Sequence, residues 1–410
     1  MNKDTKIKLK KEIFDLLYYI DKHQNKIYED NPLNIFSGTK GYMDYSDEIL
    51  DRIIKVIIKD NELKKIFSKD DLSKEIINLI YKDRIDNKSN ESIVNHLIEL
   101  IGSKPKYYSC IIPVHGIDIN KKLDLGIVTI YPIIKKEEVF KNNFSINAQN
   151  LLKNAETFAL IKVKAALPNK AIEIASKEID HTLNILKFVS NNDTKMLFSI
   201  GIGANAENNI SKEFIIIDDN NNESVSYKSN YYPMNLNINQ LKDYKDYISK
   251  MIDIQKRIFY SQSPKRDVPA IERYLFHANN LVAEGLYENT FEKQMSKFIT
   301  AVESLLGKKG EGISDKISEK AALFLGHSME NRMSIYNTMR HLYNKRSILT
   351  HGDSTDLNYY DIYYLLKISK ELCMFFFDNI EKFIDIKEPK EKIRTDALEI
   401  KFGNSGLNDE

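Results

Sequence analysis

Apolar residues recur at helical spacing along the first hundred positions of the chain. Ile13, Leu17 and Ile20 lie three or four residues apart, and similar apolar runs occur at residues 53–57 and 91–101. Such spacing places the apolar side chains on one face of a helix, which is the pattern of a helix packed against a neighbour. Residues 1–104 are therefore predicted to form a helical N-terminal region.

The pattern changes after Pro105, where β-branched and aromatic residues become frequent. The runs at residues 107–114 and 125–133 are separated by a turn-prone polar segment, so we predict that they pair as a hairpin. The further predicted elements are a strand at 158–165, a helix at 169–189 with Ile172, Ile179, Leu183 and Leu186 on its apolar face, and strands at 196–202 and 214–218. Residues 105–265 are therefore predicted to form a mixed α+β domain with a sensory or regulatory role.

From residue 241 onward the pattern is helical almost throughout, with a break at 263–269 that contains two prolines and marks a domain boundary. The predicted helices are 271–287, 291–306, 314–325, 332–350 and 356–383, with Ser314 and Asp356 at N-cap positions. We predict an all-α bundle at 266–388 and a polar tail that frays at 389–410. The predicted fold class is thus α+β, with helical regions on both sides of the mixed domain.

Composition limits the classes of function. The 60 basic and 59 acidic residues leave a net charge of +1, so any nucleic-acid contact must come from a local patch. The two cysteines, Cys110 and Cys373, form no CxxC motif, which argues against a disulfide framework or a thiolate zinc site. No apolar run reaches about 18 residues and the N-terminus lacks a signal-peptide pattern, so we expect a cytoplasmic protein without membrane contact.

One segment departs from this balance of charge. Residues 331–352 carry several basic residues and no Asp or Glu, although 59 of the 410 residues are acidic. An acid-free basic helix is a candidate surface for a phosphate backbone, with a solvated helix face as the alternative. The predicted RNA-binding residues in this segment are Arg340, His341 and Lys345.

Arg346 and His351 occupy the end of the same segment, and Gly352 follows them. The glycine permits the left-handed turn that ends a helix, which would place His351 at the helix C-terminus, where partial negative charge favours a protonated imidazole. A fixed guanidinium can stabilise charge on a reacting phosphate, and an imidazole can transfer protons near neutral pH. Because the 2′-hydroxyl of RNA supplies the nucleophile, these two groups form a minimal ribonuclease without metal or cofactor.

A single copy of this pair is insufficient for efficient cleavage. In-line attack needs a base on one side of the phosphate and an acid on the other, and one histidine cannot occupy both places. A two-fold dimer would bring two arginines and two histidines to one cleft. The chemistry therefore predicts a homodimer formed through the C-terminal helical domain.

Two sequence blocks resemble the HEPN domain of the Apea-like type. The blocks are residues 298–306 (FITAVESLL) and 346–352 (RSILTHG), and the resemblance covers about residues 270–385. It implies a helical, dimerising domain of a kind that often acts as a metal-independent endoribonuclease in toxin–antitoxin, CRISPR-linked and abortive-infection systems. It also implies that Arg346 and His351 are catalytic and that Ser347 and Glu303 are supporting residues. Many active members have Asn, Asp or His at the position of Ser347.

The sequence thus favours an antiviral endoribonuclease of the abortive-infection type, with an RNA substrate and no cofactor. The segment before residue 266 would sense a phage-derived or cellular trigger, or hold the nuclease inactive. The alternatives are a non-catalytic HEPN dimerisation scaffold, in which Arg346 makes a structural ion pair, and a regulator that binds RNA without cleaving it.

Overall fold

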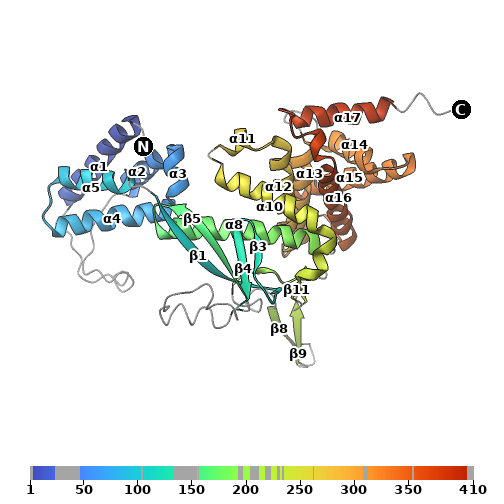
Figure 1. The fold of residues 1–410 in the computed structure, drawn as a ribbon, viewed down its shortest axis with the longest axis horizontal. Helices are drawn as coiled ribbons and strands as arrows, with labels where there is room; N and C mark the ends of the chain where they lie inside the picture. The colour runs from blue at the N-terminus through green and yellow to red at the C-terminus, as the bar shows by residue number, and fades with distance from the viewer. Residues whose placement is uncertain are drawn as a thin grey trace. The chain divides into compact units, whose positions relative to one another are not determined.

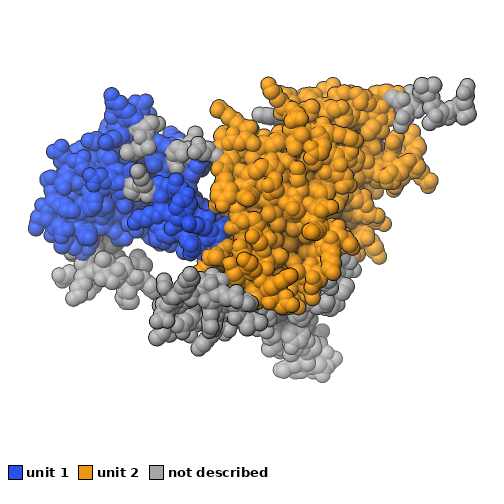
Figure 2. All heavy atoms as spheres, viewed as in Figure 1, with its two compact units in different colours: residues 1–110, 161–177 blue, residues 111–160, 178–410 orange. Residues whose placement is uncertain are grey.

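The computed structural model divides the chain into two compact units (Figure 2). Unit 1 comprises Met1–Cys110 and Ile161–Lys177, and unit 2 comprises Ile111–Leu160 and Glu178–Glu410. The residues that the structure describes are 3–23, 47–102, 105–132, 155, 157–192, 197–203, 212–217, 223–228, 231–232, 235–261, 263–307, 313–352 and 355–403.

Unit 1 contains the predicted helical N-terminal region, whose helices gather around one apolar core (Figure 1). Its helices are α1 (Lys3–His23), α2 (Asp47–Lys59), α3 (Asn61–Ile66), α4 (Lys69–Ile85) and α5 (Asn90–Gly102). Ile13, Leu17 and Ile20 are buried in this core, as their spacing predicts. The short helix α3 and the helix α4 were not predicted from the sequence.

A buried carboxylate joins α4 to α5. Asp83 is fully buried, and its two oxygens contact Lys88 Nζ at 2.7 Å and His96 Nδ1 at 2.8 Å. Burial alone would raise the pKa of Asp83, but the hydrogen bonds from Lys88 and His96 lower it below its usual value. The carboxylate therefore stays charged and paired, as a buried charge requires.

The main sheet has the strand order β3-β4-β5-β1-β7. Its strands are β1 (Lys106–His115), β3 (Leu123–Leu125), β4 (Val128–Pro132), β5 (Thr157–Ala165) and β7 (Gly201–Ile202). The predicted hairpin between 107–114 and 125–133 is wrong, because β5 lies between β4 and β1. The hairpin is instead formed by β3 and β4, which pair in register Leu125↔Val128 across a turn at Gly126, whose φ is +78°.

Three short pairings complete the β-structure of the described residues, and helix α8 follows β5. The pairs are β2 (Ile117–Asp118) with β11 (Leu236–Asn237), β6 (Leu197–Phe198) with β10 (Tyr231–Tyr232), and β8 (Lys212–Ile217) with β9 (Glu223–Lys228). The predicted strand ends at 196 and 218 lie outside the described residues. Helix α8 (Pro168–Ser190) buries Ile179, Leu183 and Leu186 as predicted, but Ile172 is 54% exposed near its start. The mixed α+β character of this region is confirmed.

The C-terminal region is helical, as predicted (Figure 1). It consists of the 3-10 helix η3 (Ile238–Tyr244), α10 (Lys245–Tyr260), α11 (Pro264–Asp267), α12 (Ala270–Leu286), α13 (Phe291–Leu306), α14 (Ile313–Leu325), α15 (Met329–Thr350), α16 (Tyr359–Asp378), the 3-10 helix η4 (Ile380–Lys382) and α17 (Pro389–Gly403). Two N-cap predictions differ from the structure. Helix α16 is capped by Asn358 in a capping box with Asp361, and not by Asp356, while Ser314 lies within the first turn of α14. None of the described helices is long and apolar enough to cross a membrane.

Helix α17 replaces the fraying tail that was predicted at its position. Ile393 and Ala397 lie one turn apart and are buried against the bundle, where α17 packs on α14 and α13. Lys401 adds an ion pair with Glu319 of α14. The segment has few apolar residues, so its composition indicates a tail, whereas their helical spacing places the buried ones on the face that contacts the bundle.

Candidate functional site

An ion pair between two helices of the bundle holds Arg346. Arg346 lies in the last turns of α15, and its Nη1 donates to Oε1 of Glu303, on α13, at 2.6 Å. The side chains are 34% and 22% exposed, so the pair is only partly screened by water. A guanidinium carries five N–H donors, and within the described residues this contact engages Nη1. The arginine is therefore held in position while part of its surface remains accessible.

Three further polar side chains lie near the C-terminal end of α13, which carries Glu303, and the sequence patterns do not indicate them. Lys390 of α17 donates to the backbone oxygen of Glu303 at 3.5 Å, and buried Lys320 of α14 donates to the backbone oxygen of Leu306 at 3.1 Å. Burial, assisted by the carboxylate of Glu303, raises the pKa of Tyr343, so this phenol stays neutral. These groups rigidify the end of α13 that carries Glu303. The sequence does not point to Lys390, because the composition of residues 389–410 predicts a tail.

His351 lies at the C-cap of α15, as the sequence predicts. Its backbone N–H contacts the carbonyl oxygens of Ser347 and Ile348, both at 3.2 Å, and Gly352 follows with φ of +86°. The His351 side chain is exposed, and so is Ser347 one turn earlier on α15. Within the described residues His351 forms no ion pair, so its imidazole is open to solvent or to a ligand.

The turn at Gly352 gives a prediction about the position of His351. A Cβ atom at Gly352 would meet nothing within 4 Å, so Gly352→Ala would be disfavoured by its left-handed backbone alone at a cost of about 1–2 kcal/mol. We expect Gly352→Ala to displace His351 and weaken any activity that depends on it, with little change in the rest of the fold. Gly352→Asn is the matched control, because asparagine tolerates this conformation. Crystal structures and unfolding curves of the two variants provide the comparison, and indistinguishable His351 positions would contradict the expectation.

The predicted RNA-binding residues contact acidic side chains of neighbouring helices, although their own segment contains no acid. Arg340 Nε contacts Asp315 of α14 at 2.8 Å, and Lys345 Nζ contacts Asp361 of α16 at 2.7 Å. His341 is 60% exposed and lies 3.7 Å from Asp361. Acidic residues on neighbouring helices thus neutralise much of the positive charge of α15. The side chains of Arg340 and His341 nevertheless remain accessible.

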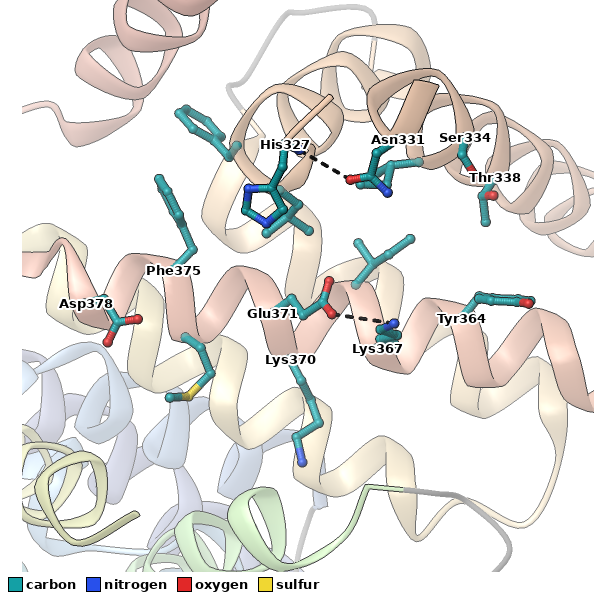
Figure 3. Close-up of a pocket in the computed structure, with 15 residues that line it drawn as sticks. His327, Asn331, Ser334, Thr338, Tyr364, Lys367, Lys370, Glu371, Phe375 and Asp378 are labelled. Atoms are coloured by element: carbon teal, nitrogen blue, oxygen red, sulfur yellow. Dashed lines mark hydrogen bonds and ion pairs between the residues drawn. The ribbon is translucent and has the colours of Figure 1, made fainter. Parts of the chain in front are cut away.

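A groove of about 880 Å³ runs beside the first half of α15, between it and α16 (Figure 3). Its polar lining includes Asn331, Ser334, Thr338, Tyr364 and the ion pair of Lys367 with Glu371 at 3.9 Å. Lys370 points away from the groove and binds the backbone oxygen of Asn191 at 2.9 Å. Arg346 and His351 lie further along α15 and do not line this groove.

The described residues contain no group of three or more His, Cys, Asp or Glu side chains placed to hold a metal ion. Comparisons of the chain with protein-family models, with curated proteins and with solved structures found no match. The fold and the site together define an α+β protein with a C-terminal helical bundle, in which a tethered arginine and an exposed histidine lie five residues apart in one helix end.

Proposed function

We propose that this protein is a HEPN-type endoribonuclease that cleaves RNA by attack of the RNA's own 2′-hydroxyl. One observation carries the proposal. The helix end that exposes His351 also holds Arg346, and Glu303 fixes the guanidinium from a second helix. An oriented cation beside an accessible proton-transfer group is what cleavage without a protein nucleophile requires.

In the proposed reaction Arg346 binds a non-bridging oxygen of the scissile phosphate and stabilises the charge that develops on it. A first His351 takes the proton of the 2′-hydroxyl as its oxygen attacks phosphorus. A second His351 donates a proton to the departing 5′-oxygen, leaving a 2′,3′-cyclic phosphate and a free 5′-hydroxyl. The second histidine comes from another copy of the chain, so the active form is a homodimer that brings the two α15 helix ends together.

The biological setting follows from the resemblance to HEPN domains. We place the protein in the cytoplasm, in an antiviral or abortive-infection system in which RNA cleavage acts as a toxin. The segment before residue 266 then responds to a phage-derived or cellular trigger.

The substrate offers a direct test of the chemistry. Purified protein is incubated with a labelled RNA in the presence of a chelator, and with the same RNA carrying 2′-O-methyl groups throughout. We expect cleavage of the first RNA only, with 2′,3′-cyclic phosphate ends on the products. Cleavage of the methylated RNA, or products with 5′-phosphate ends, would exclude attack by the 2′-hydroxyl.

A second function is favoured by the Arg346–Glu303 contact itself. A partly buried ion pair between α13 and α15 is also what a structural cross-link of a scaffold domain would look like. In that case Arg346→Ala would weaken the bundle or its dimerisation, and the unaltered protein would not cleave RNA. Analytical ultracentrifugation and unfolding of Arg346→Ala, beside the cleavage assay, separate the two functions.

A further inference from the structure

The exposed surface of the parts of β1 and β5 that belong to unit 1 has no role in the site described above. Side chains of a strand alternate between its two faces, so Tyr107 and Ser109 of β1 lie on one face, and Tyr108 and Cys110 lie on the other. The second face is covered, since Tyr108 Oη contacts the backbone oxygen of Ala166 at 3.5 Å and Cys110 Sγ contacts that of Ala171 at 3.7 Å. The face that carries Tyr107 is the exposed one.

Two lysines of the neighbouring strand β5 lie over Tyr107. Lys162 and Lys164 are both exposed, and their Nζ atoms are 5.1 Å and 5.9 Å from the centre of the tyrosine ring. Tyr107 itself is 66% exposed. An aromatic ring with two ammonium groups therefore forms an open platform, which we call the Tyr107 platform and define as Tyr107, Lys162 and Lys164.

In the part of the chain that the structure describes, no acidic side chain pairs with the charges of this platform. Lys162 and Lys164 are two positions apart on one strand, so their Cα atoms are about 6.6 Å apart. Within the described residues neither lysine forms a salt bridge, in contrast to Arg340, Lys345 and Arg346 of α15. The two like charges repel each other, and among the described residues their ammonium groups contact the tyrosine ring. An anionic ligand would relieve this repulsion.

We propose that the Tyr107 platform binds single-stranded RNA, with a base stacked on Tyr107 while Lys162 and Lys164 turn from the ring to the neighbouring phosphates. An open aromatic ring beside cations on a sheet surface suits unpaired bases, because stacking accepts any base and lysine neutralises the backbone. In a duplex the base faces are already stacked and unavailable to the ring. The choice of RNA rests on the proposed function, whereas the platform itself lies on β1 and β5, outside the helical bundle, so its binding does not require His351 chemistry.

The test uses the full chain carrying His351→Ala, so that RNA remains intact, and measures the anisotropy of a labelled single-stranded 20-mer at several salt concentrations. We expect Lys162→Glu with Lys164→Glu to weaken binding at least about tenfold and to lower the salt slope by about 1.4, the value for two phosphates on a single strand. Tyr107→Ala should weaken binding about tenfold and Tyr107→Phe should preserve it, because stacking needs the ring and not the hydroxyl. The double variant Lys162→Gln with Lys164→Gln removes the two charges without reversing them. It should also weaken binding, which shows whether the loss in the Glu variant comes from a folding defect.

The matched control reverses two exposed lysines elsewhere, Lys245→Glu with Lys256→Glu on α10, and should leave RNA affinity unchanged. Equal affinities of the parent and the platform variants would overturn the inference, as would an equal loss in the control pair. Displacement by duplex RNA or by an acidic peptide as effective as by single-stranded RNA would also overturn it. If the platform variants lose RNA binding while the unaltered protein cleaves no RNA, the platform proposal is supported and the nuclease proposal is contradicted. If the unaltered protein cleaves RNA and the platform variants bind it as well as their parent, the nuclease proposal is supported and the platform proposal is contradicted.

Discussion

Replacing His351 with alanine is expected to lower the rate of RNA cleavage by about 10²- to 10⁴-fold, the usual contribution of a general acid or base. The reason is the position of His351, whose imidazole is exposed at the end of α15 and has no competing ion pair within the described residues. Folding should be unaffected, because the side chain is not part of the core. The measurement is the single-turnover rate with a labelled RNA at saturating protein.

Arg346→Lys tests the second half of the same site. Lysine keeps a positive charge but loses the planar fork of the guanidinium, so it cannot hold Glu303 and a phosphate oxygen together. We therefore expect the cleavage rate to fall by about 10²-fold or more. Asn344→Ala, an exposed position on the same helix, is the control and should cleave normally. RNA cleavage rates that are unchanged in both His351→Ala and Arg346→Lys would contradict this mechanism.

Replacing Arg257 with methionine is expected to lower the free energy of unfolding by about 3 kcal/mol. Glu272 of α12 is fully buried, and Arg257 of α10 contacts both of its oxygens, at 2.8 Å for Oε1 and 2.5 Å for Oε2. The hydrogen bond to Glu272 raises the pKa of Arg257, so the guanidinium remains charged. Among the described residues, its removal leaves Lys250, at 3.5 Å, as the cation that contacts the buried carboxylate.

Two further variants show whether the buried carboxylate causes this loss. Asp253 also contacts Arg257, at 2.9 Å, but it is 56% exposed, so Asp253→Ala should cost only about 0–1 kcal/mol. Glu272→Gln combined with Arg257→Met should recover much of the stability, because the unpaired charge is then absent. Urea unfolding followed by circular dichroism measures all of these variants. Equal effects of Arg257→Met and Asp253→Ala would contradict the explanation.

The sheet shows why strands were easier to predict than their partners. Alternation and β-branched residues identify residues 107–114 and 158–165 as strands, because these are local properties of the chain. The strands that pair with them depend on residues distant in sequence, since β5 lies between β4 and β1 and follows β4 after a connection of more than twenty residues. A turn-prone segment between two strand-like runs therefore indicated a hairpin that the completed sheet does not contain.

The charge of α15 shows the same contrast between what local sequence encodes and what distant contacts decide. The sequence alone located Arg346, His351 and the turn at Gly352, because a helix end and its left-handed glycine are encoded within a few residues. It also showed a helix segment without acids, but it could not show that acids from α14 and α16 lie against that segment. Those contacts join residues 16 to 25 positions apart and arise from helix packing.

The amino-acid sequence by itself determined the helical N-terminal and C-terminal regions and the mixed region between them. It also determined that Arg346 and His351 lie at the end of one helix. These features depend on local periodicity and spacing. Only the tertiary structure decided that Glu303 holds Arg346, that α17 packs on the bundle, and that Lys162 and Lys164 meet Tyr107 on an open sheet face. The physical reason is that burial and ion pairing depend on which distant segments approach each other, and the free energy of the whole fold sets that approach.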